Sequence, residues 1–192
     1  VGTISAQYNH YLEWKDPFPF KVEDIADVAD NGQNIFLQGV LEKRNLLDIL
    51  RNFILYETEK DIGKRIKKVA RYQQFRAVNK ALHKLVNGKD TLSRGGVIFH
   101  TQGSGKSLTM VLLARKLRRT PQLNDATIVV VTDRIDLDKQ IYNTFLRTLS
   151  TITTPIRAES VKEMKGLLSR AQPQIIMTTI HKFQSDTEEA LR

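Results

Sequence analysis

The stretch GGVIFHTQGSGKSLTMVLLARKL at residues 95–117 decides the fold. An apolar run at 96–99, which we expect to form a strand, leads into the glycine-rich residues 100–107, and an apolar helical pattern follows from 108 to 117. A glycine-rich loop between a strand and a helix directs backbone N–H groups toward a bound anion, and the positive end of the helix dipole adds to them. The stretch therefore predicts a phosphate-binding loop.

The residue types in this loop suit a nucleoside triphosphate with Mg²⁺. Gly103 and Gly105 permit the backbone conformations that turn consecutive N–H groups inward. We expect Lys106 to reach the β and γ phosphates and the hydroxyl of Ser107 to hold the metal ion, so that both are catalytic residues. The expected nucleotide-binding run is Thr101, Gln102, Gly103, Ser104, Gly105, Lys106 and Ser107.

One position departs from the general pattern GxxxxGK[ST], because His100 stands where the first glycine is expected. The core pattern GxGK[ST] is intact. A dinucleotide-binding GxGxxG would need a glycine at Leu108, and a hydrolase GxSxG would need glycines at Gln102 and Lys106. A glycine-rich turn without a ligand is the alternative interpretation.

Beyond the loop, the apolar pattern alternates between strands and helices. Short apolar runs at 128–131 and 175–177 are separated by helical patterns at 137–149 and 161–168, and Ser160 with Glu163 forms a capping box that opens the second helix. Such alternation is typical of a parallel sheet covered on both faces. We therefore predict an α/β fold with a parallel sheet and flanking helices.

The residues before the loop have mostly helical spacing. The apolar positions from 35 to 56 predict two helices, with a break near 43–45. A further amphipathic helix is expected over 72–85, and Asn87-Gly88 provides its stop. The sequence thus predicts a small, mainly helical region ahead of the sheet.

Polar residues follow two of the expected strands. Open α/β sheets bind ligands at the carboxyl ends of their strands, and hydroxyl groups and cations there suit phosphodiester oxygens without base specificity. Plain capping or loop roles are the alternative. The residues that we expect to contact DNA are Thr132, Asp133, Arg134, Thr178, Thr179 and Lys182.

The net charge of +9 comes from one part of the chain. Residues 60–89 hold ten lysines and arginines against Asp61 alone. A concentrated positive charge attracts polyanions, of which nucleic acid is the commonest, although a basic run is also often a solvated helix face. The sequence leaves open whether this stretch contacts DNA or neighbouring domains.

Several classes of protein are excluded by composition. The chain has no cysteine, which excludes disulfides and thiolate chemistry and favours a reducing cytoplasm. Its four histidines are too scattered to suggest a metal site. No apolar run approaches the ~20 residues of a membrane span, and the first residues do not resemble a secretion signal. We therefore expect no contact with a membrane.

The stretch 95–117, together with IVVVTDRIDLDKQ at 128–140 and IIMTTIHKFQ at 175–184, resembles the motor of the R subunit of type I restriction enzymes. The segments 46–57 and 70–81 resemble the connection between that family's nuclease domain and its first RecA-like domain. The resemblance implies a helical linker over residues 1–66, and most of a RecA-like P-loop NTPase domain over residues 67–192.

The same resemblance implies function. Such subunits couple ATP hydrolysis, with Mg²⁺, to translocation of double-stranded DNA, cleave DNA with a separate nuclease domain, and pair with methylation and specificity subunits. Gln74, three residues before Ala77, resembles the glutamine that reads adenine in superfamily 2 helicases, and an amide matches the adenine edge. Other superfamily 2 helicases and a nucleotide-switched assembly module are the alternatives.

Two features that the whole enzyme needs are missing from the sequence. No acidic DEAH-type box follows Phe183, and no aspartate precedes Glu13-Trp14-Lys15 in the first twelve residues, where a nuclease would need one. We expect these 192 residues to bind ATP and DNA but neither to hydrolyse ATP well nor to cleave DNA.

Overall fold

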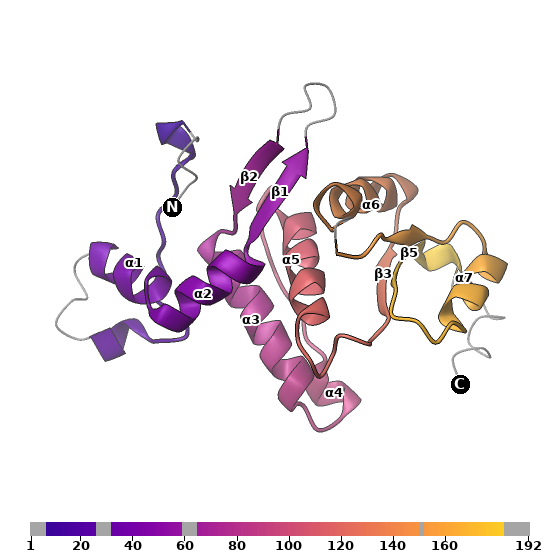
Figure 1. Cartoon of the computed structure of the whole chain (residues 1–192), viewed down its shortest axis with the longest axis horizontal. Helices are drawn as coiled ribbons and strands as arrows, with labels where there is room; N and C mark the ends of the chain where they lie inside the picture. Colours follow the sequence, from indigo (N-terminus) through magenta and orange to yellow (C-terminus); the bar gives the residue numbers. More distant parts are fainter. Residues whose placement is uncertain (1–6, 26–31, 59–64, 150–151, 183–192) are drawn as a thin grey trace. The chain divides into compact units, whose positions relative to one another are not determined.

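The computed structural model divides the chain into two compact units, residues 1–104 and 105–192. The structure describes residues 7–25, 32–58, 65–149 and 152–182, drawn in colour in Figure 1. Lys60, Asp61 and Lys64 of the basic stretch therefore lie outside the described residues. Within the described ranges, no helix is both long and apolar enough to cross a membrane.

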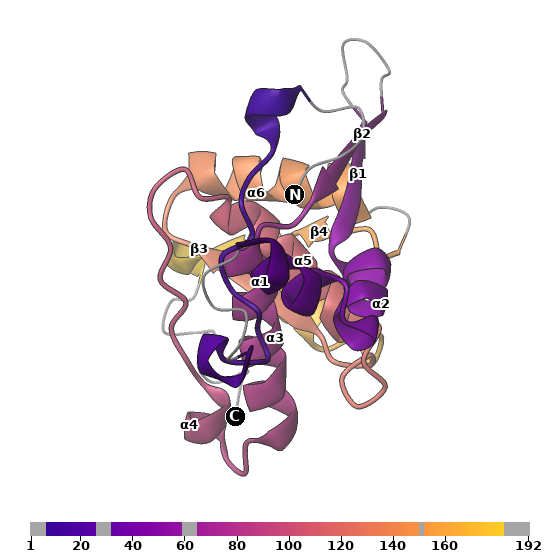
Figure 2. The ribbon, with the colours of Figure 1, turned by 90° about the vertical axis from the view of Figure 1, so that its left-hand side faces the viewer.

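The first unit combines helices with one antiparallel strand pair. After two short 3₁₀ turns at Tyr8–His10 and Val22–Ile25, its elements are α1 (Gly32–Val40), α2 (Lys43–Asn52), β1 (Ile54–Thr58), β2 (Arg65–Val69), α3 (Tyr72–Asn87) and α4 (Thr91–Arg94). Strands β1 and β2 form a ribbon that extends from the helices of this unit in both views (Figures 1 and 2).

The strand pair corrects one prediction. The apolar pattern over 35–56 predicted helix to its end, whereas α2 ends at Asn52 and residues 54–58 form β1. Ile54, Leu55 and Tyr56 are β-branched, aliphatic and aromatic residues that also suit a half-buried strand. Leu55 is buried while Tyr56 is exposed, which is the alternation expected of a strand. The sequence pattern fits both a helix and a strand here, and pairing with β2 selects the strand.

An aromatic cluster forms the centre of the first unit. The ring of Phe75, on the buried face of α3, lies with its centroid 4.8 Å from that of Phe53, 5.7 Å from Trp14 and 6.3 Å from Phe18. Phe75 is only 1% exposed. Tilted and edge-on aromatic pairs at these distances add to the gain from burial. The cluster therefore holds the segment around Trp14 and Phe18 against α3.

The second unit contains the predicted parallel sheet. Its elements are α5 (Lys106–Arg118), β3 (Ile128–Thr132), α6 (Ile135–Leu149), β4 (Ile156–Arg157), α7 (Val161–Leu168), β5 (Ile175–Thr179) and a 3₁₀ turn at Ile180–Lys182. The strand order is β3-β5-β4, and both pairings are parallel. Figure 1 shows α6 and α7 on opposite sides of this sheet. The prediction of an α/β fold with flanking helices is confirmed.

One expected strand is absent and one was missed. Residues 97–99 form no strand, and Val97 and Phe99 are 94% and 87% exposed. An apolar run becomes a strand only where a neighbouring strand satisfies its backbone N–H and C=O groups. The third strand is instead the two-residue β4, which is too short to leave a periodic signal in the sequence.

Arg118, in the last turn of α5, forms hydrogen bonds that hold the segment between α5 and β3 in place. Its guanidinium donates to the carbonyls of Asn124, Ala126 and Gln174 at 2.8, 2.5 and 2.5 Å. Burial lowers the pKa of Arg118, and the nearby carboxylate of Asp125 opposes that shift. The guanidinium thus links the loop before β3, through Asn124 and Ala126, to Gln174, the residue before β5.

Truncation of the central aromatic ring tests the core of the first unit. We expect Phe75→Ala to lower the free energy of unfolding by about 3–5 kcal/mol, the usual cost of removing a buried phenylalanine ring. Urea unfolding of the chain measures this loss. Leu92→Ala is the matched control, because Leu92 is 91% exposed and its truncation should change stability by less than about 0.5 kcal/mol. Equal effects of the two substitutions would contradict the packing.

Candidate functional site

The glycine-rich loop has the backbone conformation that the sequence predicted. Gly103 and Gly105 have φ angles of +76° and +85°, in the left-handed region that favours glycine. The backbone N–H and the hydroxyl of Ser104 both donate to the carbonyl of Thr101, at 3.3 and 2.6 Å. Gly105 is the N-cap of α5, and its carbonyl accepts the first helical hydrogen bond, from the N–H of Thr109 at 3.0 Å.

The loop exposes the groups that phosphates require. Thr101, Gln102, Gly103 and Lys106 are exposed, while Ser104, Gly105 and Ser107 are half-buried. Lys106 and Ser107 are the first two residues of α5, a helix of 13 residues whose N-terminal N–H groups carry a partial positive charge. The loop thus presents a cation, a hydroxyl and backbone donors close together in the sequence.

The donor set of the loop fits an Mg²⁺ ion that is held mainly by phosphate oxygens. In the parts of the chain that the structure describes, no group of three or more His, Asp or Glu side chains is placed to hold a metal ion. Mg²⁺ usually takes one or two protein oxygens and completes its shell with phosphate oxygens and water. The hydroxyl of Ser107 can supply one such oxygen.

Gln74 lies in the first turn of α3, in the first unit, and has a structural role there. Its side chain is buried, and its Oε1 accepts a hydrogen bond of 2.9 Å from the backbone N–H of Arg71. This contact caps α3 at its N-terminus. Neighbouring Gln73 is exposed. If Gln74 forms hydrogen bonds with adenine, it would use the same side-chain amide that caps α3.

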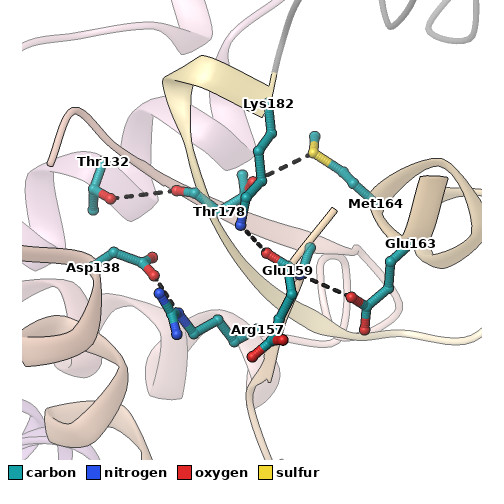
Figure 3. A network of polar contacts seen from close by, with 9 residues as sticks. Thr132, Asp138, Arg157, Glu159, Glu163, Met164, Thr178 and Lys182 are labelled. Atoms are coloured by element: carbon teal, nitrogen blue, oxygen red, sulfur yellow. Dashed lines mark hydrogen bonds and ion pairs between the residues drawn. The ribbon is translucent and has the colours of Figure 1, made fainter. Parts of the chain in front are cut away.

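Parallel pairing brings the strand-end residues to one edge of the sheet. Thr132 pairs with Thr179 in the register of β3 and β5. The side chains of Thr132, Thr178 and Thr179 are buried, with at most 5% of each residue exposed. As Figure 3 shows, the hydroxyl of Thr132 donates to the carbonyl of Thr178 at 3.4 Å, and the hydroxyl of Thr178 donates to the sulfur of Met164 at 3.5 Å. Two of the three threonine hydroxyls are thus used inside the fold.

The charged residues of this edge are more accessible than the threonines. The side chain of Arg134 is 82% exposed and lies 3.6 Å from the carboxylate of Asp133, which is itself 64% exposed. Lys182 is half-buried, and its ammonium group donates to the carbonyl of Ala158, just after β4 (Figure 3). Of the six residues that the sequence singled out here, Asp133 and Arg134 offer the most exposed polar groups.

An ion pair that the sequence analysis missed lies beside the same edge. The Nε of Arg157, in β4, donates to the buried carboxylate of Asp138, in α6, at 2.5 Å (Figure 3). A cavity of about 510 Å³ opens next to the pair, lined by Lys139, Tyr142, Asn143, Pro155, Ile156, Arg157 and Glu159. No short motif marks this place, because its residues come together only when β4 joins the sheet.

Comparison with known proteins gives a consistent result. Residues 73–192 match the sequence model of the SWI2/SNF2 ATPase family. The chain is 37% identical, over 99% of its length, to the type I restriction enzyme HindI endonuclease subunit of Haemophilus influenzae. It is 36% identical, over 95% of its length, to a protein of Methanocaldococcus jannaschii that bears the name of the same class of subunit, MjaIXP. The chain spans 18% of the length of each of these relatives.

Two glycine substitutions of opposite expected sign test the loop geometry. Gly103→Ala meets no atom within 4 Å, so its cost should come from the positive φ alone and amount to roughly 1–2 kcal/mol of stability. Gly166→Ala also has open space but lies within α7, where alanine should gain about 0.5–1 kcal/mol over glycine. Urea unfolding measures both. A stability gain from Gly103→Ala would contradict the left-handed conformation.

Proposed function

The chain belongs to the SWI2/SNF2 ATPase family, and from this premise we propose that it is the ATP-binding part of the motor of a type I restriction enzyme R subunit. The observation that carries the proposal is the loop at 101–107, with its two left-handed glycines at the start of α5. In the whole protein, ATP hydrolysis would drive translocation of double-stranded DNA, and a separate nuclease domain would cut it. Methylation and specificity subunits would be its partners, and the cytoplasm, where the DNA is, its compartment.

We further propose a division of the chain into a linker at 1–66 and most of the first RecA-like domain at 67–192. The family match, which begins at residue 73, supports this boundary. The linker follows a nuclease domain in this proposal. It is less helical than the sequence suggested, because it contains β1 and the first two residues of β2.

The residues of the loop suit binding and orientation of a triphosphate. Backbone N–H groups of residues 101–105 and the N-terminus of α5 would surround the phosphate oxygens, and Lys106 would add a mobile positive charge. Ser107 would contribute an oxygen to Mg²⁺, which when bound neutralises charge that builds up on the phosphates. Gln74 would bind the adenine edge through its amide.

DNA contact is proposed at the carboxyl edge of the sheet. Exposure of Arg134 supports a phosphate contact by that side chain, and Lys182 adds a second cation at the same edge. Asp133 would orient Arg134 through their ion pair. The side chains of Thr132, Thr178 and Thr179 are buried. For these three residues we therefore propose that a phosphate contacts mainly the backbone.

Substitution of the loop lysine tests the nucleotide site. We expect Lys106→Ala to weaken binding of a fluorescent ATP analogue with Mg²⁺ by at least about tenfold, since a hydrogen bond to a charged group is worth about 1.5–3 kcal/mol. Lys162→Ala is the matched control, because Lys162 is an exposed lysine in the first turn of α7. Equal affinity of both variants would refute the site. The intact chain should hydrolyse ATP more slowly than about 1 per second, the low end of typical turnover.

A second substitution tests the adenine contact. Gln74→Glu keeps an oxygen that accepts from Arg71 N–H but removes the amide donor. We expect the preference for ATP over GTP to fall by about tenfold, within the 1–3 kcal/mol of a bidentate base contact. Because the new carboxylate replaces a buried amide, the free energy of unfolding should fall as well. Gln73→Glu, on the exposed neighbour, should leave the preference intact. Competition titrations measure it, and an unchanged preference in Gln74→Glu would remove this residue from the site.

A further inference from the structure

The ribbon of β1 and β2 has one face against the first unit and one face exposed. Leu55 is buried and Ile66 half-buried, and both belong to the inner face. Tyr56 pairs directly with Lys67 across the ribbon, so the two side chains share the other face, and Arg65 joins them because it lies two residues from Lys67. Tyr56, Arg65 and Lys67 are all exposed. We call these three residues the ribbon face.

Two cations of the ribbon face lie against one aromatic ring. The guanidinium carbon of Arg65 is 4.5 Å from the ring centroid of Tyr56, and the ammonium nitrogen of Lys67 is 5.8 Å from it. A cation over an aromatic ring is held by the negative face of the ring, which limits the freedom of its long side chain. Two like charges held this close together produce a strong local potential for an anion.

Three other cations of the basic stretch have partners within the first unit, whereas Lys80 and Lys89 are exposed. Lys68 forms an ion pair with Glu57, Arg76 forms one with Asp16, and Lys84 donates to the carbonyl of Gly95 at 3.0 Å. Among the residues that the structure describes, Arg65 and Lys67 form no such ion pair, and their recorded contact is the ring of Tyr56. The ribbon face thus concentrates uncompensated positive charge.

We propose that the ribbon face binds the phosphate backbone of duplex DNA. The proposal deepens the motor function above and rests on it, because it adds a DNA contact in the first unit to those at the sheet edge of the second. Charge complementarity favours DNA as the occupant, and a two-stranded antiparallel ribbon is narrow enough to enter the major groove. The ribbon extends from the helices of its unit (Figure 2), and the three side chains of the ribbon face are exposed.

Removal of the two charges tests the ribbon face directly. The double variant Arg65→Gln/Lys67→Gln is titrated with a fluorescent duplex of mixed sequence at several salt concentrations. Each lost phosphate contact should lower the slope of log affinity against log salt by about 0.9, which corresponds to roughly eightfold weaker binding at 0.1 M salt. The control Lys80→Gln/Lys89→Gln removes the same charge from exposed positions in and after α3, and should retain the slope.

Two substitutions of Tyr56 test whether the ring positions the cations. Tyr56→Phe keeps the ring and should bind duplex DNA within about twofold of the intact chain. Tyr56→Leu removes the ring and should bind severalfold more weakly with an unchanged salt slope, because both charges are still present. Circular dichroism and urea unfolding of each variant check that the ribbon is folded.

The outcomes separate this inference from the proposed function. If Arg65→Gln/Lys67→Gln has the affinity and slope of the control pair, the inference is wrong and the ribbon face serves another partner, such as a protein. An intact chain that binds no duplex even at low salt overturns it as well. Nucleotide binding, measured in the same samples, reports separately on the loop, so that its sensitivity to Lys106→Ala decides the proposed function whatever the ribbon does.

Discussion

Strand β5 is the element on which the second unit depends. It pairs in parallel with β3 on one side and with β4 on the other, and all five of its residues are buried. On the α7 side, Ile176 packs with Ala158, Met164 and Leu167 in one apolar cluster. Because all three strands run in the same direction, their carboxyl ends meet at one edge. The positions of Arg134 and Lys182 follow from that pairing.

The glycine-rich loop at 101–107 depends on a more local constraint. Its two left-handed glycines allow the chain to turn sharply before α5, and the first residues of that helix are the lysine and the serine of the motif. Few long-range contacts are needed to create this arrangement. For that reason the loop could be identified from a short stretch of sequence, together with the conformations of its glycines.

Side chains away from the loop were harder to assign from the sequence. Thr132 and Thr178 were expected to face DNA, but the strand that carries each one turns its hydroxyl into the fold. Gln74 was expected at the adenine, and the structure adds a capping role that no spacing rule indicates. Arg157 and Asp138 gave no signal at all, because they are 19 residues apart and meet only through the sheet. Alternation and spacing define the element on which a residue lies, whereas its direction depends on what packs around it.

The sequence alone determined the fold class, the glycine-rich loop and the resemblance to the R subunit family, because these depend on local periodicity and on residues within a few positions of one another. The tertiary structure decided which apolar runs became strands: residues 54–58 pair with 65–69, while 97–99 form no strand. It also paired Lys68 and Arg76 with carboxylates and placed Arg65 and Lys67 against the ring of Tyr56. Strand pairing and ion pairing join residues that are distant in the chain, and such partners can be identified only once the chain has folded.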